Sequence, residues 1–259
     1  MGAKTATDRN PDAAAWRIFV ISLADAYERR RRISEQCAEL GLEFEIVAAV
    51  DGRGGLSAEF ESRIDRNAAE ARCGRPLSDG EFACALSHRS IYQRIADEGL
   101  PGAVVLEDDA ILSSSFAEFI RHQGYCEADV VQMDYGPARV FWRQRRSWSN
   151  EIALAPLAEN AHLTSGYSIS ARGARYMLAQ TMPLAGLADW PCDMIPLRPL
   201  ITVPRLVQQP EACASDSDLK SERDFLIENR DPIAARWRRF GRRDYWRRWW
   251  MKRRTRRIS

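Results

Sequence analysis

Residues 102–112 of the chain are Gly-Ala-Val-Val-Leu-Glu-Asp-Asp-Ala-Ile-Leu, a short apolar run followed directly by three acidic residues. The apolar part predicts a strand that is buried on both faces of a sheet. Because α/β proteins bind ligands at the carboxyl ends of such strands, Glu107, Asp108 and Asp109 are candidates for a ligand site. Adjacent carboxylates repel one another and are costly to bury, which favours a hard divalent cation as their partner. The alternative interpretation is an acidic, solvated turn after an edge strand.

Length and composition indicate one folded domain with a tail. The chain has 259 residues, 45% of them hydrophobic and 9% aromatic, which suits one large domain and is short for two. We expect a flexible N-terminus at residues 1–16, one domain at 17–220 and a tail at 221–259. Six cysteines occur without a CxxC pair, and no early apolar run is long enough to span a bilayer. The sequence therefore predicts reduced thiols that are not metal ligands.

The tail differs from the rest of the chain in charge. Residues 236–259 carry twelve Lys and Arg, one acid and six aromatic residues, so the net charge of +2 divides into +11 there and −9 before it. Basic and aromatic side chains together favour an anionic membrane surface, and we expect a helical tail that holds a peripheral protein on the cytoplasmic face of an inner membrane. A disordered, solubilising tail is one alternative. Nucleic-acid binding is another, but the acidic body argues against it.

The first half of the domain predicts a β-α-β unit. A strand at residues 18–23 precedes a helix, for which Asp25 and Glu28 form an N-terminal capping signature and Gly41 marks the end. A second strand follows at 44–50, so the two strands should be parallel. We expect an α/β fold with a mostly parallel sheet flanked by helices. A GxGxxG dinucleotide fingerprint does not follow the first strand.

Later segments complete the predicted domain. Ser78 and Glu81 form a capping box for a helix that continues to about Glu98, with His88 on its apolar face. On spacing alone, a histidine in this position is more often a hydrogen-bonded core residue than a catalytic one. Strands are expected at 129–135 and 163–170 and helices at 116–123 and 171–181. The basic, aromatic segment 139–150 predicts a mobile loop over a site.

Six short motifs occur in a recognisable order. They are Val20-Ile21-Ser22-Leu23 with Glu28-Arg29-Arg30, Ala49-Val50-Asp51-Gly52, Gly80-Glu81-x-x-Cys84-x-x-Ser87-His88, Leu106-Glu107-Asp108-Asp109, Thr164-x-Gly166-Tyr167-x-x-Ser170 and Pro191-x-Asp193. Together they resemble glycosyltransferase family 25, the bacterial lipooligosaccharide and lipopolysaccharide galactosyltransferase-like proteins. The resemblance covers roughly residues 17–220.

The resemblance implies a GT-A fold and a metal-dependent, inverting transfer of a hexose from a UDP-sugar, usually UDP-galactose or UDP-glucose. The metal would be Mn²⁺ or Mg²⁺, bound by Asp109 with Glu107. The acceptor would be a lipopolysaccharide, a lipooligosaccharide or another glycan, lipid-linked at the membrane surface. A homologue that binds the nucleotide sugar without transferring it is the alternative. The chain departs from many GT-A enzymes because no histidine lies near Val207 to serve as a late metal ligand.

The resemblance also assigns donor-binding residues. They are Ser22, Leu23, Arg29, Arg30, Asp51, Glu81, Ser87, His88, Glu107, Asp108 and Tyr167. Some have purely structural alternatives, since Arg29 and Arg30 can belong to a solvated helix face and Glu81 to a capping box.

An inverting transfer also needs a base that takes the proton of the acceptor hydroxyl, commonly a carboxylate. Asp193 matches the late motif and is the first choice, with Asp189 and Asp134 in reserve. A structural role for Asp193 in its proline turn is the alternative.

Overall fold

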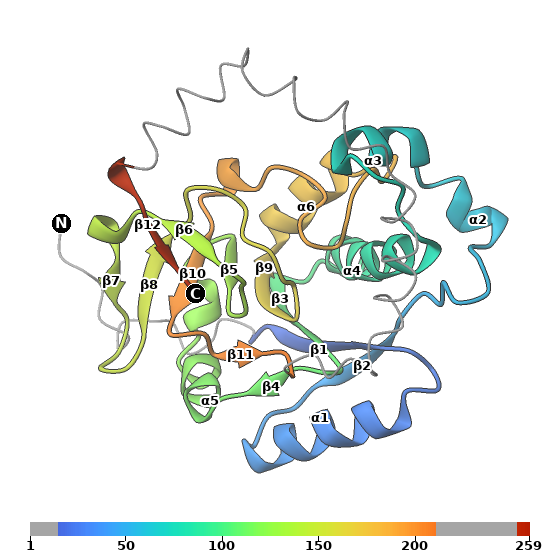
Figure 1. Ribbon diagram of the computed structural model, residues 1–259. Helices are drawn as coiled ribbons and strands as arrows, with labels where there is room; N and C mark the ends of the chain where they lie inside the picture. Colours follow the sequence, from blue (N-terminus) through green and yellow to red (C-terminus); the bar gives the residue numbers. More distant parts are fainter. Residues whose placement is uncertain (1–14, 211–252) are drawn as a thin grey trace.

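The structure is a computed structural model that describes residues 15–210 and 253–259, built around one eight-stranded sheet (Figure 1). The strand order is β2-β1-β3-β9-β5-β10-β8-β7. The strands of this sheet are β1 (Arg17–Ser22), β2 (Glu45–Ala48), β3 (Gly102–Glu107), β5 (Val130–Gln132), β7 (Arg146–Ser147), β8 (Ala153–Pro156), β9 (Gly166–Ser170) and β10 (Leu200–Val203). Two small sheets pair β4 (Ile111–Leu112) with β11 (Val207–Gln208) and β6 (Ala138–Val140) with β12 (Arg256–Ile258).

Helices cover both faces of the large sheet (Figure 1). The α-helices are α1 (Tyr27–Glu39), α2 (Ala58–Glu61), α3 (Arg66–Cys73), α4 (Asp79–Asp97), α5 (Ser114–Arg121) and α6 (Ala171–Gln180). Short 3₁₀ helices are η2 (Gly124–Cys126), η3 (Trp142–Gln144) and η4 (Ile195–Leu197). None of the helices in the described part of the chain is both long and apolar enough to cross a membrane.

Successive side chains of β1 and β3 enter two different cores, because strand side chains alternate between the faces of a sheet. Val20 and Leu106 pack with residues of α1 and α5 on one face. Phe19 and Val105 pack with residues of α4 and α6 on the other face. All four side chains are fully buried. The prediction that β3 is buried on both faces is confirmed.

The opening β-α-β unit is parallel as predicted, but the sheet as a whole is mixed. β1 runs parallel to both β2 and β3, and β5 runs parallel to β10. β9 lies between β3 and β5 and is antiparallel to both, and the pairs β10–β8 and β8–β7 are also antiparallel. A mostly parallel sheet was therefore the wrong expectation. Parallel neighbours need a long crossover, usually a helix, whereas residues 133–165, all described, contain no α-helix between β5 and β9.

The two predicted helix starts had different outcomes. The capping box of α4 is confirmed, since Ser78 Oγ accepts the Glu81 N–H at 3.2 Å and Glu81 Oε2 accepts the Ser78 N–H at 3.0 Å. The capping signature at Asp25 is wrong, because the N-cap of α1 is Ala26. Asp25 instead forms an ion pair with Arg53, in which Arg53 Nη1 lies 2.8 Å from Asp25 Oδ2.

The segment 139–150 is not a plain loop. It contains the end of β6, then η3 and β7, and β7 forms the edge of the large sheet beside β8. β6 pairs antiparallel with β12, so the last residues of the chain form a strand where a helical tail was expected. Ile258 of β12 packs against the cluster around Val140. Residues 1–14 and 211–252, which hold most of the predicted N-terminal segment and tail, lie outside the described residues.

The capping box gives a stability prediction. Ser78→Ala should lower the free energy of unfolding by about 1 kcal/mol, because the first turn of α4 loses an acceptor in a buried position. Ser57→Ala is the matched control, since Ser57 is the N-cap of α2 but is exposed and makes no capping hydrogen bond in the structure. Urea unfolding measures both changes. Equal effects of the two substitutions would contradict the assigned role of Ser78.

Candidate functional site

The three acidic residues at the end of β3 turn toward different elements. Alternation along the strand directs Glu107 to the α4 side and Asp108 to the α1 side. Glu107 Oε1 lies 3.2 Å from His88 Nε2 of α4. Asp108 Oδ1 lies 3.4 Å from Arg29 Nε of α1. The carboxyl end of β3 therefore collects groups from both helical layers.

Glu107 is held by a hydrogen-bond network. Its Oε1 also accepts the Thr164 hydroxyl at 3.2 Å, and His88 Nδ1 lies 2.9 Å from the Tyr167 hydroxyl. The Tyr167 hydroxyl lies 3.0 Å from that of Tyr92, and both rings are buried. Burial opposes ionisation of Glu107, but the hydrogen bonds from His88 and Thr164 leave the pKa of this carboxyl below its ordinary value. Glu107 is thus held in place by partners that favour its ionised form.

Asp108 is bound by the end of β1 and the start of α1. Ser22 Oγ donates to Asp108 Oδ2 at 2.6 Å, and Arg30 Nε donates to Ser22 Oγ at 2.9 Å. Burial raises the pKa of Asp108, although Ser22 and Arg29 oppose this shift. Ser22, Arg29 and Arg30, predicted from the sequence to bind the donor, therefore lie together at one side of the site.

Asp109 is the acid that lacks a complete set of partners. Its Oδ1 is buried and has no hydrogen-bond partner in the described part of the chain. Burial, together with the charges of Glu107 and Asp108, raises the pKa of Asp109 to about 7. An orphaned carboxylate oxygen beside two other carboxylates fits a hard divalent cation, because the cation would supply both the missing contact and the missing charge. Asp109 and Glu107 are the residues that the sequence predicts to hold it, and this assignment stays a prediction.

A loop before β9 carries residues that sequence reasoning did not assign to the site. Gln132 Nε2 donates to the carbonyls of Ala161, His162 and Leu163 at 3.2, 3.1 and 2.6 Å. Leu163 has a φ of 78°, so this loop is held in a strained conformation. The loop brings Thr164 to Glu107. Thr164 stands in a recognised motif, but nothing in the sequence indicates that a buried Gln132 fixes the loop.

Gly166 begins β9 where another segment passes closely. A Cβ at this position would lie 2.7 Å from Cβ of Val207 in β11. The Gly166 carbonyl accepts the N–H groups of Met133 and Asp134. The glycine therefore allows β11 to lie against the start of β9, two residues after Thr164.

Of the three candidate bases, Asp189 and Asp193 lie in different surroundings. Asp189 is partly buried, accepts a backbone hydrogen bond from Leu163, and lies 3.8 Å from His162 Nδ1. Burial raises the pKa of Asp189, and the charge of Glu107 adds to the shift. Asp193 is exposed, and its Oδ1 accepts the N–H of Ile195 at the start of η4. Asp189 is therefore the more buried of the two carboxylates, and which residue acts as the base stays a prediction.

Some predicted site residues have partners elsewhere. Glu81 completes the capping box and also accepts Arg75 Nη1 at 2.8 Å. Arg53 lowers the pKa of the exposed Asp51 to about 2 through side-chain hydrogen bonds. Asp134 is buried, accepts the Ser165 hydroxyl at 2.6 Å and lies 3.7 Å from Arg205.

Two further predicted residues hold backbone close to the site. Ser87 Oγ accepts the Val50 N–H at 2.8 Å and so fixes the chain that follows β2. The Leu23 carbonyl accepts the N–H of Ala26 and thereby shapes the turn between β1 and α1. Both residues act on the backbone that frames the acidic cluster, and their contact with a donor stays a prediction.

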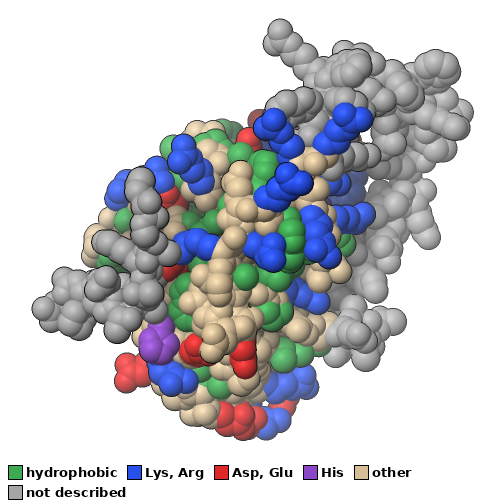
Figure 2. Space-filling view, turned by 90° about the vertical axis from the view of Figure 1, so that its left-hand side faces the viewer, with side chains coloured by type: hydrophobic (Ala, Val, Ile, Leu, Met, Phe, Trp, Pro, Cys, Tyr) green, Lys and Arg blue, Asp and Glu red, His purple; other side chains and the backbone are tan. Residues whose placement is uncertain are grey.

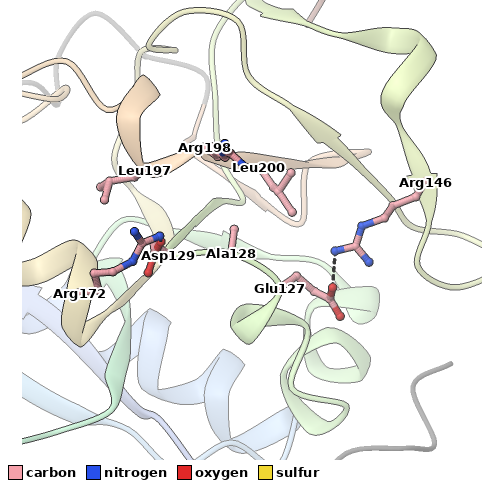
Figure 3. Close-up of a pocket in the computed structure, with 8 residues that line it drawn as sticks. All are labelled: Glu127, Ala128, Asp129, Arg146, Arg172, Leu197, Arg198 and Leu200. Carbon is pink, nitrogen blue, oxygen red and sulfur yellow. Dashed lines mark hydrogen bonds and ion pairs between the residues drawn. The ribbon is translucent and has the colours of Figure 1, made fainter. Parts of the chain in front are cut away.

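A separate hollow lies at the opposite edge of the sheet (Figure 3). Asp129, one of its lining residues, accepts the Ser170 hydroxyl, and Ser170 pairs with Gly102 at the start of β3. The acids of this hollow are already paired, Glu127 with Arg146 and Asp129 with Arg172. The acidic cluster, with its orphaned oxygen, is therefore the stronger candidate for a functional site.

The sequence is similar to a known protein family and to several characterised proteins. The family described as "Glycosyltransferase family 25 (LPS biosynthesis protein)" matches residues 15–195. "Lacto-N-neotetraose biosynthesis glycosyltransferase LgtE" of Neisseria gonorrhoeae is 32% identical over 171 residues, 61% of this chain and 58% of the relative. "Procollagen galactosyltransferase 1" of Danio rerio is 29% identical over 169 residues, 62% of this chain and 28% of the relative.

A third relative carries a different description. "Inactive glycosyltransferase 25 family member 3" of Mus musculus is 30% identical over 171 residues, 62% of this chain and 28% of the relative. The chain thus matches less than two thirds of the length of each of these relatives.

The raised pKa of Asp109 predicts a pH-dependent stability in the presence of EDTA. Between about pH 4 and pH 7 the folded state binds more protons at Asp109 than the unfolded state, so the wild type should lose stability as the pH rises through this window. Asp109→Asn removes this loss and should raise the free energy of unfolding at pH 8 by an amount of order 1 kcal/mol, with a smaller gain at pH 4. Urea unfolding at both pH values tests this. The exposed Asp193, changed to Asn, is the control, and an equal gain there would contradict the prediction.

Proposed function

Because the chain belongs to glycosyltransferase family 25, we propose that it is a metal-dependent, inverting hexosyltransferase that uses a UDP-sugar donor. The observation that carries this proposal is the buried, unpartnered oxygen of Asp109 beside Glu107 and Asp108. The cation, Mn²⁺ or Mg²⁺, would neutralise the charge that develops on the leaving diphosphate without a proton transfer. The name of the zebrafish relative favours galactose as the hexose.

The residues around the acidic cluster have complementary roles in this proposal. Asp109 and Glu107 hold the cation, and the hydrogen bonds from His88 and Thr164 keep Glu107 ionised and oriented. Arg29 and Arg30, next to Asp108, supply positive charge for the donor phosphates. Preorganised charges of this kind stabilise a transition state better than mobile ones.

We assign the role of base to Asp189. Its carboxyl lies on the loop side of the site, near His162 and within the electrostatic influence of Glu107. A carboxyl whose pKa is raised by burial is a stronger proton acceptor than an exposed one. The hydroxyl of a saccharide acceptor would give its proton to Asp189 as the sugar inverts.

The names of the relatives indicate a glycan or glycoprotein acceptor but differ in which one. One relative is named for lacto-N-neotetraose biosynthesis and another for procollagen, so the family serves different acceptors. We propose a lipopolysaccharide-type or lipooligosaccharide-type glycan, which the family description favours. A homologue without transfer activity is the second candidate, because one relative is described as inactive.

The test of the function is a donor screen with purified protein. UDP-galactose and UDP-glucose are supplied with Mn²⁺ and a saccharide acceptor, and released UDP is measured. Asp109→Ala should lower turnover by roughly a thousandfold, because a metal ligand at the leaving group is lost. Asp97→Ala, an exposed acid on α4, is the control. Full activity in EDTA would contradict the metal requirement, and UDP binding without turnover of any donor would favour the inactive alternative.

The base assignment predicts a difference between two substitutions of the same kind. Asp189→Asn should lower transfer by about a hundredfold or more and leave donor affinity nearly unchanged, since a proton acceptor is removed with little change of shape. Asp193→Asn should retain most transfer, because that carboxylate is exposed and binds the N–H of Ile195. Single-turnover kinetics and UDP titration measure both effects. The opposite pattern would return the role to Asp193.

We also propose that the basic C-terminal region binds an anionic membrane surface. Figure 2 shows arginine side chains gathered on the face where β7, β8 and β12 lie. The exposed arginines of that region among the described residues are Arg143, Arg145, Arg146, Arg253, Arg254, Arg256 and Arg257. They add to the charge of the tail residues that lie outside the described part. Attachment on the cytoplasmic face would place the enzyme beside a lipid-linked acceptor.

A test of membrane binding must spare β12, because truncation before residue 236 would also remove this strand from β6. Internal substitution of Arg238, Arg239, Arg242 and Arg243 by Gln should weaken binding to anionic vesicles at least tenfold, since each basic residue contributes about 1 kcal/mol. Turnover of a small soluble acceptor should be unaffected. Vesicle co-sedimentation measures binding, with neutral vesicles as the control. Unchanged sedimentation would show that other residues make the contact.

A further inference from the structure

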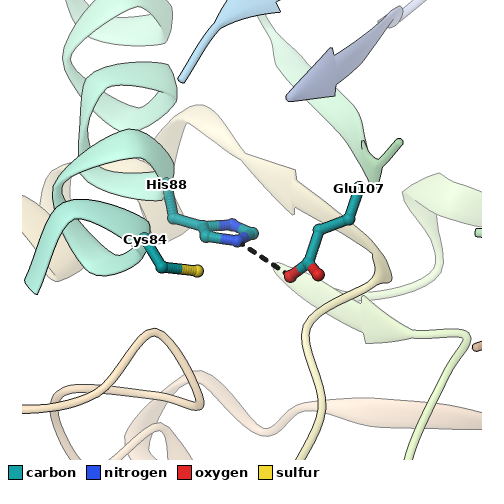
Figure 4. A group of neighbouring side chains, drawn as sticks. All are labelled: Cys84, His88 and Glu107. Atoms are coloured by element: carbon teal, nitrogen blue, oxygen red, sulfur yellow. Dashed lines mark hydrogen bonds and ion pairs between the residues drawn. The ribbon is translucent and has the colours of Figure 1, made fainter. Parts of the chain in front are cut away.

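A thiol, an imidazole and a carboxylate converge beside the acidic cluster (Figure 4). Cys84 and His88 lie four residues apart and therefore on one face of α4. Glu107 reaches the same point from the end of β3. One possible ligand atom from each residue, Sγ, a ring nitrogen and a carboxylate oxygen, lies within 4.8 Å of the other two.

This ligand set differs in chemistry from the oxygen ligands around Asp109. Cysteine, histidine and carboxylate ligands together suit Zn²⁺, whereas Mn²⁺ and Mg²⁺ prefer oxygen. Zinc bond lengths imply ligand atoms roughly 3.3–3.8 Å apart in a tetrahedral site. His88 Nε2 and Glu107 Oε1, at 3.2 Å, are already near this spacing. Cys84 Sγ lies within 4.8 Å of both atoms, so a small movement of its side chain toward them would complete a set of three ligands.

The surroundings orient two of the three ligands. The Tyr167 hydroxyl contacts His88 Nδ1 at 2.9 Å, which leaves Nε2 as the nitrogen that faces Glu107. Thr164 fixes the carboxylate of Glu107 by a hydrogen bond of 3.2 Å. Metal-binding histidines usually have their second nitrogen held in this way, and such outer contacts strengthen binding. Cys84 is only partly buried, so a fourth ligand position could be filled by water.

The local charge also favours a cation. Burial raises the pKa of the Cys84 thiol, and the negative charges of Glu107, Asp189 and Asp109 raise it further. The carboxyl groups of Glu107, Asp189 and Asp109 are thus close enough to this thiol to act on it. A bound divalent cation would favour the thiolate form of Cys84 and would compensate the negative charge of the carboxylates.

We propose that Cys84, His88 and Glu107 form a binding site for a borderline divalent cation such as Zn²⁺, separate from the hard cation held by Asp109. Both sites use Glu107, so Zn²⁺ at the first site withdraws this carboxylate from the second. Zn²⁺ is then an inhibitor of transfer, a consequence that rests on the proposed function. Zinc binding itself does not depend on that function.

Cadmium is the probe for the site, because Cd²⁺ bound to a thiolate gives an ultraviolet charge-transfer absorption. Titration of the full chain should produce this band, and Zn²⁺ should displace it. Cys84→Ser should abolish the band, while Cys73→Ser should keep it, since Cys73 is a free, partly buried thiol at the end of α3 outside the cluster. Glu107→Gln should lower the affinity for Cd²⁺ at least tenfold. Circular dichroism checks that each variant is folded.

Two outcomes would overturn the site: no band in the wild type, or a band that persists in folded Cys84→Ser. The variant Asp109→Asn separates this proposal from the proposed function. This variant should retain the cadmium band although it cannot support Mn²⁺-dependent transfer. The band therefore tests the Cys84 site and the transfer assay tests the proposed function, and one proposal can be wrong without the other. In the wild type, Zn²⁺ should inhibit Mn²⁺-dependent transfer, and Cys84→Ser should weaken this inhibition at least tenfold. Equal zinc inhibition of both proteins would overturn the competition for Glu107.

Discussion

The repulsion among three consecutive carboxylates at the end of a buried strand is the constraint on which the rest of the site depends. Their negative charges cannot be buried side by side without compensation. The fold gives each acid a different partner, with His88 and Thr164 at Glu107 and with Ser22 and Arg29 at Asp108. Asp109 keeps an oxygen that no described residue satisfies. The described protein groups therefore compensate only part of the negative charge, and a bound cation would compensate the rest at Asp109.

The mixed sheet is what brings these partners together. β9 passes antiparallel beside β3, so its first residues lie at the carboxyl end of β3. This places Tyr167 next to His88 and Thr164 next to Glu107. In an all-parallel arrangement the start of β9 would lie at the opposite edge of the sheet. The reversed direction of this strand is thus a condition for the hydrogen bonds that hold Glu107.

The far end of the sheet has a different organisation. Exposed arginines lie between β6 and β8, in η3, at Arg145 and in β7, and in residues 253–257, whose strand β12 pairs with β6. Arg256 lies over the ring of Trp142, with 4.6 Å between Cζ and the ring centroid. The acidic cluster and the basic face are thus separate regions, and the basic face combines arginines of residues 143–146 with those of residues 253–257.

The sequence by itself determined the features that depend on residues close together in the chain. Apolar periodicity indicated β1, β3 and α4, the pair Ser78 and Glu81 marked the start of α4, and the acids after Leu106 indicated the site. Motif order indicated the family. Only the tertiary structure decided the direction of β9, the pairing of β12, and the different surroundings of Asp189 and Asp193. The physical reason is that strand direction, burial and pKa depend on residues distant in sequence. Cys84, His88 and Glu107 likewise became one cluster only when α4 packed against the sheet.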